Sequence, residues 1–167
     1  NVGAVYGDGD VVWKNGRSLK KVTLNHSVKN VSGRWFLYGF DDLMEIAGPE
    51  DHPDINFYNG CIYSKDYSKL IYYPSAKDYS ESLLHENVTS FGNYAFVQHK
   101  KLEEFTIPLN INVLGTWIFY NTPITKIIVH ENVQSIGEQC FSWNSKLREA
   151  EINTPNLNGS NILATII

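Results

Sequence analysis

One pattern of apolar and polar positions is written three times between residues 87 and 152. Each copy has a branched aliphatic residue, two variable positions, an apolar residue and glycine, and it ends on a phenylalanine four positions after the glycine. The closing residues are Phe96, Phe119 and Phe141. A strand-like stretch follows each copy, and these stretches cover residues 102–108, 124–130 and 147–152. Their leading apolar residues are 22 and 23 positions apart, so the pattern has a nearly fixed period.

Alternation within the strand-like stretches predicts their orientation. Phe105 and Ile107 are two positions apart and therefore point to the same side of a strand, whereas Glu104 and Thr106 point to the other side. A period of 20 to 29 residues with this apolar skeleton is typical of a leucine-rich repeat solenoid. We therefore expect successive repeats to stack these strands into one parallel sheet, with neighbouring strands about 4.8 Å apart.

The remaining positions of each repeat predict the rest of the coil. The short stretches 90–91, 113–114 and 135–136 form the opposite wall, and a glycine after each one allows a sharp turn. The three phenylalanine rings stack between the walls. The expected fold is a β-rich solenoid of the α/β class: a right-handed coil with a curved parallel sheet, short second strands, short helical or 3-10 turns and one β-hairpin insertion.

The chain length of 167 residues suits a single domain of about five to six rungs. Residues 87–152 hold the regular repeats, and residues 49–86 form an irregular repeat. Residues 1–18 resemble the tail of a repeat, since the aromatic Trp13 precedes Leu19 as Phe96 precedes Leu102. The chain opens within the pattern and ends on an apolar tail. We therefore expect a piece of a longer array, with a tail that folds back as a plug as the alternative.

The irregular repeat contains a turn-rich loop at 49–54 and two β-rich runs, 61–64 and 69–74, around a short polar linker. This arrangement predicts a hairpin. When Pro74 is aligned with Pro108, Ile71 and Tyr73 take the inward positions and Tyr72 the outward one.

Composition narrows the classes of partner. Fourteen basic and eighteen acidic residues give a net charge of −4, and no basic stripe occurs along the chain. We therefore do not expect the protein to bind nucleic acid. No apolar run approaches the roughly 18 residues of a membrane span, so direct membrane insertion is not expected. Cys61 and Cys140 occupy apolar strand or turn positions and are expected to be buried free thiols. The sequence gives no indication of oligomeric state.

The repeat series Val-x-x-Phe/Ile-Gly-x-x-Ala/Cys-Phe, followed by Leu-x-x-Phe/Ile-x-Ile-Pro, resembles the BspA-type leucine-rich repeat family over roughly residues 11–152. The segment 59–74 is similar to a hairpin unit that recurs in this family. Ser32, His130 and Ala150 depart from the pattern. The resemblance implies a cell-surface or secreted protein, and some members bind extracellular-matrix proteins or mediate adhesion.

Catalytic and metal-binding patterns are missing from the sequence. His85 and His130 share a repeat position with one repeat between them, so they should lie about 10 Å apart, too far to share a zinc ion. Both are expected to be surface turn residues. No nucleophile elbow, phosphate loop or dinucleotide fingerprint occurs. We therefore expect no enzyme activity, no metal and no cofactor.

The outward sheet positions are the expected binding face for a protein partner, since mixed charge with interspersed apolar groups suits a protein better than a polyanion. An ordinary solvated sheet face is the alternative. The expected contact residues are Glu45, Tyr72, Glu104, Thr106, Lys126 and Ile128.

Two further surface features are expected. Tyr94 and Trp117 share a repeat position and either stack on each other or form a platform for a sugar or a protein. N-x-S/T sequons, which carry glycans only in a secreted eukaryotic protein, occur at Asn25, Asn30, Asn87 and Asn158. The sequence thus predicts a non-catalytic protein-interaction or adhesion module, with a structural spacer or a carbohydrate-binding module as alternatives.

Overall fold

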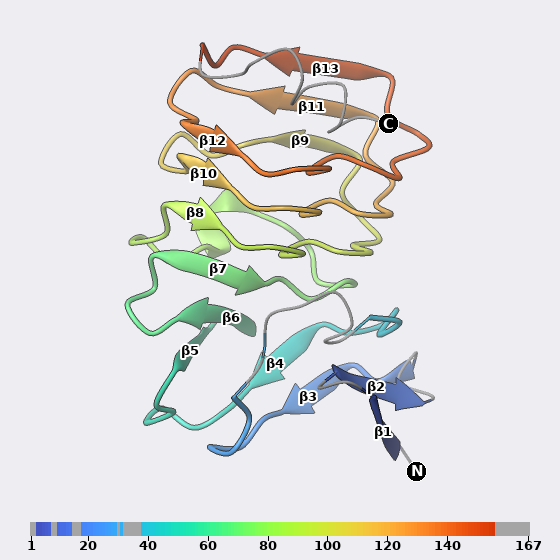
Figure 1. Cartoon of the computed structure of the whole chain (residues 1–167), viewed down its shortest axis with the longest axis vertical. Helices are drawn as coiled ribbons and strands as arrows, with labels where there is room; N and C mark the ends of the chain where they lie inside the picture. Colours follow the sequence, from blue (N-terminus) through green and yellow to red (C-terminus); the bar gives the residue numbers. More distant parts are fainter. Residues whose placement is uncertain (1–2, 8–9, 15–17, 30, 32–37, 156–167) are drawn as a thin grey trace.

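The computed structural model describes residues 3–7, 10–14, 18–29, 31 and 38–155, and it shows a solenoid whose coils stack along one long axis (Figure 1). The predicted leucine-rich repeat architecture is confirmed. In the described part of the chain, nearly all regular structure consists of short strands.

The predicted parallel sheet is formed by three strands of the regular repeats. They are β9 (Glu104–Thr106), β11 (Lys126–Val129) and β13 (Glu149–Ile152). All pair in parallel, and Lys126 lies opposite Glu104 on one side and Glu149 on the other. Those offsets of 22 and 23 positions are the period of the sequence, so each repeat supplies one coil. We call the outward side of these three strands the sheet face.

The opposite wall is a longer sheet, and it contains the predicted short strands. Those strands are β8 (Ser90–Phe91), β10 (Val113–Leu114) and β12 (Ser135–Ile136), paired in parallel. The sheet continues through three earlier strands, β7 (Lys69–Tyr72), β6 (Cys61–Ser64) and β5 (Ile55–Tyr58). β7 runs parallel to β8, whereas β6 runs antiparallel to both of its neighbours. The predicted hairpin is therefore present, and β5 is an additional strand.

A column of aromatic rings fills the space between the walls. Phe96 stacks on Phe119 with ring centroids 5.6 Å apart and an interplanar angle of 11°, and Phe119 stacks on Phe141 at 5.7 Å and 14°. Tyr73 extends the column, 5.2 Å from Phe96. All four rings are buried. Each ring is supplied by a different coil, so the core is closed by neighbouring coils rather than within any one of them.

Glycine is required in the turns after the second-wall strands, for a reason other than the expected one. The positive-φ glycines of the described chain are Gly39 and Gly60, so Gly92, Gly115 and Gly137 do not themselves adopt the left-handed conformation. A Cβ on Gly137 would lie 2.5 Å from the carbonyl carbon of Gly115, and one on Gly115 would lie 2.7 Å from the backbone nitrogen of Asn93. The requirement comes from the close approach of backbones in successive coils.

The alignment of Pro74 with Pro108 is wrong, and the error affects Tyr72. β7 lies in the second wall, where Leu70 pairs with Phe91, and Tyr73 occupies the position of Phe96. Tyr72 is therefore buried, with 3% of its surface exposed, instead of pointing outward. The chain segment next to β9 on the other wall is residues 75–86, which contain the 3-10 helix η2 (Glu81–Leu83) rather than a strand.

The N-terminal part forms two smaller sheets. β3 (Lys21–Thr23) and β4 (Glu45–Ala47) pair in parallel, and this pair is separate from the β9–β11–β13 sheet. β1 (Gly3–Gly7) and β2 (Asp10–Lys14) pair in an antiparallel hairpin, so the expectation that residues 1–18 continue the repeat is wrong. Ser32 lies outside the described residues.

The ring column predicts a large loss of stability when its central member is removed. Phe119 contacts Phe96, Phe105 and Phe141 and is fully buried. Phe119→Ala should lower the free energy of unfolding by about 3–5 kcal/mol. Leu109→Ala, at a site that is 70% exposed, should change it by less than about 0.5 kcal/mol. Urea denaturation followed by circular dichroism measures both; similar values for the two variants would contradict the role of the column.

Candidate binding surfaces

The sheet face brings together four of the six residues expected to bind a partner. Glu104 and Thr106 of β9 lie opposite Lys126 and Ile128 of β11, and Glu149 and Glu151 of β13 complete the two columns. Glu104, Thr106, Glu149 and Glu151 are exposed, and Lys126 and Ile128 are half-buried. The structure therefore places an aliphatic side chain and a lysine inside a border of acidic groups.

The charges on the sheet face are unbalanced. The Lys126 ammonium is 2.6 Å from Glu149 Oε1. This hydrogen bond and the attraction of the surrounding carboxylates raise the pKa of Lys126. Glu104, Glu149 and Glu151 oppose one lysine, which leaves a net charge of −2 on the face. A partner that carries positive charge would therefore be attracted to it.

The other two expected residues lie elsewhere. Glu45 is on β4, where it forms an ion pair with Lys21 at 2.6 Å. Tyr72 is buried in the second wall. Residues 75–86 lie between β4 and β9: Ala76 N–H donates to Leu43 O, and Lys100 N–H donates to Ser75 O. The expected continuous column of outward residues is therefore interrupted at η2.

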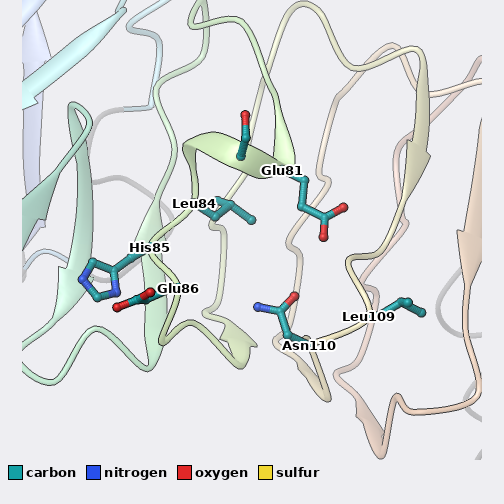
Figure 2. A pocket seen from close by; sticks show the side chains of 7 residues that line it. Glu81, Leu84, His85, Glu86, Leu109 and Asn110 are labelled. Atoms are coloured by element: carbon teal, nitrogen blue, oxygen red, sulfur yellow. The ribbon is translucent and has the colours of Figure 1, made fainter.

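A hollow opens on the β9 side of η2 (Figure 2). It has a volume of about 600 Å³, and its lining residues include Glu81 and Glu86, the second of which lies beside the ring of His85. In Figure 2, Glu81 points from η2 toward the turn that carries Asn110, and Leu84 lies beside Glu81 on the side of His85. Leu109, three positions after the end of β9, is 70% exposed and also lines the hollow. We call this the acidic hollow.

A second hollow of similar size, about 610 Å³, lies on the β4 side of the same segment. Its charged lining includes Lys20, Lys21 and Lys77, with Met44 and Leu83 as apolar members. Leu83 and Leu84 thus face hollows of opposite charge. Sequence analysis missed both hollows, because residues 75–86 have no repeat pattern that predicts their position beside the sheet.

The turns between the second wall and the sheet carry an aromatic ridge formed by Tyr94, Trp117, Tyr120 and Trp143. The ring of Tyr120 lies 5.3 Å from Trp117 and 5.8 Å from Trp143. Tyr94 and Trp117 are half-buried against the same apolar cluster, which includes Val97 and Tyr120. Trp143 is 68% exposed. Tyr120 and Trp143 were missed because they stand three and four positions after the slot shared by Tyr94 and Trp117.

Several ridge residues occupy an unfavourable backbone conformation. Trp117 and Trp143 have φ values of 57° and 62°, and Asn121, at the position equivalent to Trp143 one coil earlier, has 55°. The left-handed region is disfavoured for most side chains and most readily adopted by glycine, asparagine and aspartate. Tryptophan at Trp143 is therefore explained neither by backbone preference nor by burial.

Four of the five histidines make the same hydrogen bond within a turn. In His52, His85, His99 and His130, Nδ1 accepts a hydrogen bond from the backbone N–H two positions later. This fixes the proton on Nε2, which in His52 and His130 donates to a carbonyl of the preceding coil, Val28 O and Pro108 O. The expectation that His130 lies at the surface is wrong, since it is buried. No cluster of three metal-ligating side chains occurs among the described residues.

The remaining expected residues are placed as follows. Cys61 and Cys140 are free and buried as predicted, and burial raises the pKa of Cys61 to about 12. Asn25 and Asn87 are exposed, whereas Asn30 and Asn158 lie outside the described residues. The described part of the chain contains no helix with the length and apolar character that a membrane crossing requires.

Comparison with known families gives one match. Residues 72–163, more than half of the chain, match six copies of the BspA type leucine rich repeat region. No curated protein sequence matches the chain.

Three solved structures share the fold. A leucine-rich repeat protein from Eubacterium ventriosum ATCC 27560 is 22% identical with a TM-score of 0.68, over 83% of this chain and 37% of that one. The pneumococcal vaccine antigen PcpA is 21% identical with a TM-score of 0.61, and the match covers 84% of this chain and 40% of that one. A leucine rich cell surface protein from Faecalibacterium prausnitzii A2-165 is 17% identical with a TM-score of 0.52, and the match covers 89% of this chain and 51% of that one. The chain thus spans between about a third and a half of these structures.

The buried His99 predicts a pH-dependent stability. Burial lowers the pKa of His99 to about 4, whereas an unfolded histidine has a pKa of about 6.5. The unfolded chain therefore binds more protons between these values, and acidification from pH 6.5 to 4 should remove about 2–3 kcal/mol of stability through this residue.

His99→Asn provides the comparison, because an asparagine oxygen can accept the same Lys101 N–H. The free energy of unfolding, measured in urea at pH 7, 6 and 5, should fall more steeply with acidification in the wild type than in the variant. Parallel pH profiles would contradict the assignment.

Proposed function

The chain belongs to the BspA-type leucine-rich repeat family, and on that premise we propose that it is a non-catalytic interaction module that binds a protein through its sheet face. The observation that carries the proposal is the acidic border of Glu104, Glu149 and Glu151 around Lys126 and Ile128. Repeat solenoids of this family are typically scaffolds, and they present extended surfaces for binding.

The partner we propose carries a basic surface with an apolar group at its centre. Lys126 is already paired with Glu149, so the uncompensated charge of the face is negative. Ile128, half-buried between Thr106 and Glu151, offers an apolar contact. Complementary charge of this kind raises the association rate and selects between partners more than it adds affinity.

The acidic hollow extends this surface beyond the end of β9. Glu81 and Glu86 line it, and neither forms an ion pair with another described residue. We propose that a lysine or arginine side chain of the partner enters the hollow beside exposed Leu109. Its volume of about 600 Å³ gives ample room for such a side chain.

We further propose that the module acts outside the cell, as part of a larger surface or secreted protein, in adhesion or in binding to an extracellular-matrix protein. Support comes from the family and from the neighbour described as a leucine rich cell surface protein.

Neutralising the acidic border tests the proposal. The full chain is immobilised, and binding of purified extracellular-matrix proteins such as fibronectin and laminin is measured by biolayer interferometry at 50 and 300 mM NaCl. We expect saturable, salt-sensitive binding of at least one protein. The triple variant Glu104→Gln/Glu149→Gln/Glu151→Gln should bind it about tenfold more weakly.

The control is a second triple variant that has the same net charge as the first. Glu50→Gln/Asp54→Asn/Glu138→Gln removes three exposed carboxylates that lie away from the sheet face and should leave binding within about twofold. Equal weakening by both triple variants would show that only total charge matters. Absence of binding to every protein offered would favour a structural spacer.

A further inference from the structure

The aromatic ridge is a second surface, independent of the sheet face. Its rings follow one another from coil to coil: Trp117 and Tyr120 come from one coil and Trp143 from the next, with centroid distances of 5.3 and 5.8 Å between consecutive rings. Trp143 is 68% exposed and Trp117 half-buried. The ring planes are inclined to each other by 64° and 47°, and Tyr120 is buried, so the ridge offers a ligand the rings of Trp117 and Trp143, each supported by Tyr120.

Amide side chains accompany the exposed rings. In one column of equivalent turn positions, Trp117 is preceded by Tyr94 and followed by Gln139. In the other, Trp143 follows Asn121. Among the described residues, the side chains of Asn121 and Gln139 make no hydrogen bond, so each keeps a donor and an acceptor for a ligand.

Charge is missing from the columns that make up the ridge. Their positions hold aromatic, amide, aliphatic or hydroxyl side chains, and none of them is ionisable at neutral pH. These positions are Tyr94, Val97, Gln98, Trp117, Tyr120, Asn121, Gln139, Ser142 and Trp143. The sheet face, by contrast, is dominated by carboxylates.

From this combination we propose that the aromatic ridge binds a neutral oligosaccharide. The C–H face of a pyranose ring is apolar and weakly positive, and it packs on the negative face of an indole or phenol ring. The hydroxyl groups at the rim of the sugar need both donors and acceptors, which Asn121 and Gln139 supply. An anionic glycan would need cations, and none stands at these positions.

The ridge crosses successive coils, and neighbouring coils are separated by about 4.8 Å, so a ligand built of several linked rings can contact more than one coil. A ridge of three coils is also narrow for a stable protein interface, which buries about 800 Å² on each partner. The backbone conformation of Trp143 agrees with selection for contact, since Asn121 occupies the equivalent position at lower conformational cost.

The test uses the indole N–H resonances of the four tryptophans. The ¹⁵N-labelled full chain is titrated with the neutral hexasaccharides cellohexaose, laminarihexaose, maltohexaose and chitohexaose, and with a sulfated heparin hexasaccharide. We expect a saturable shift of the Trp117 and Trp143 resonances with at least one neutral probe and none with heparin. Trp117→Gln and Trp143→Asn, which insert the residues of the neighbouring coils, should each weaken that binding about tenfold.

Tyr58→Asn is the matched control, because Tyr58 is an aromatic residue that is 39% exposed and lies on β5, away from the ridge. It should leave the affinity within about twofold. If Trp117→Gln fails to fold, Trp143→Asn still tests the proposal, because the Trp143 ring is mostly exposed to solvent and its removal should not prevent folding. The proposal is overturned if no neutral probe gives a saturable shift, if only heparin does, or if Trp143→Asn binds as tightly as the wild type. The outcome does not depend on the carboxylates of the sheet face.

Discussion

The structure depends on contact between neighbouring coils. A single repeat has two short strands and one phenylalanine, and its walls enclose too little apolar surface to hold together. Stacking closes the core: Phe119 is covered on one side by Phe96 and on the other by Phe141, with the rings nearly parallel in both pairs. The backbones of successive coils are also in close contact, since a Cβ added to Gly137 would collide with the backbone of Gly115.

This constraint also determines where function is available. The inward side chains pack in the core around the ring column. Residues that could bind a ligand are therefore found on the outward side of the strands and in the turns. The sheet face uses the former to gather carboxylates around Lys126 and Ile128. The aromatic ridge uses the latter, where a repeated left-handed turn position places Trp117 and, one coil later, a neighbouring turn places Trp143. The two surfaces differ in charge and so suit ligands of different chemistry.

Sequence reasoning succeeded where the period is strict. The registers of β9 with β11 and of β11 with β13, the ring column and the buried thiol of Cys140 follow from residues 87–152, because equivalent positions in stacked coils must meet. In residues 49–86 it predicted the hairpin but aligned Pro74 wrongly with Pro108, so Tyr72 was expected to point outward although it is buried. The hollows beside η2 were not predictable, because residues 75–86 replace a strand without carrying a repeat pattern. Trp143 occupies the position that Asn121 holds one coil earlier, and an aromatic residue at that turn position was a signal that sequence reasoning did not use.

The central claim, that stability resides in contacts between adjacent coils, is tested most directly by double-mutant cycles within the ring column. Free energies of unfolding are measured for Phe→Leu variants at Phe96, Phe119 and Phe141, alone and in pairs. Coupling of about 0.5–1.5 kcal/mol is expected for the adjacent pairs 96/119 and 119/141, and values near zero for the separated pair 96/141. Equal coupling in all three pairs, or none in any, would contradict the account.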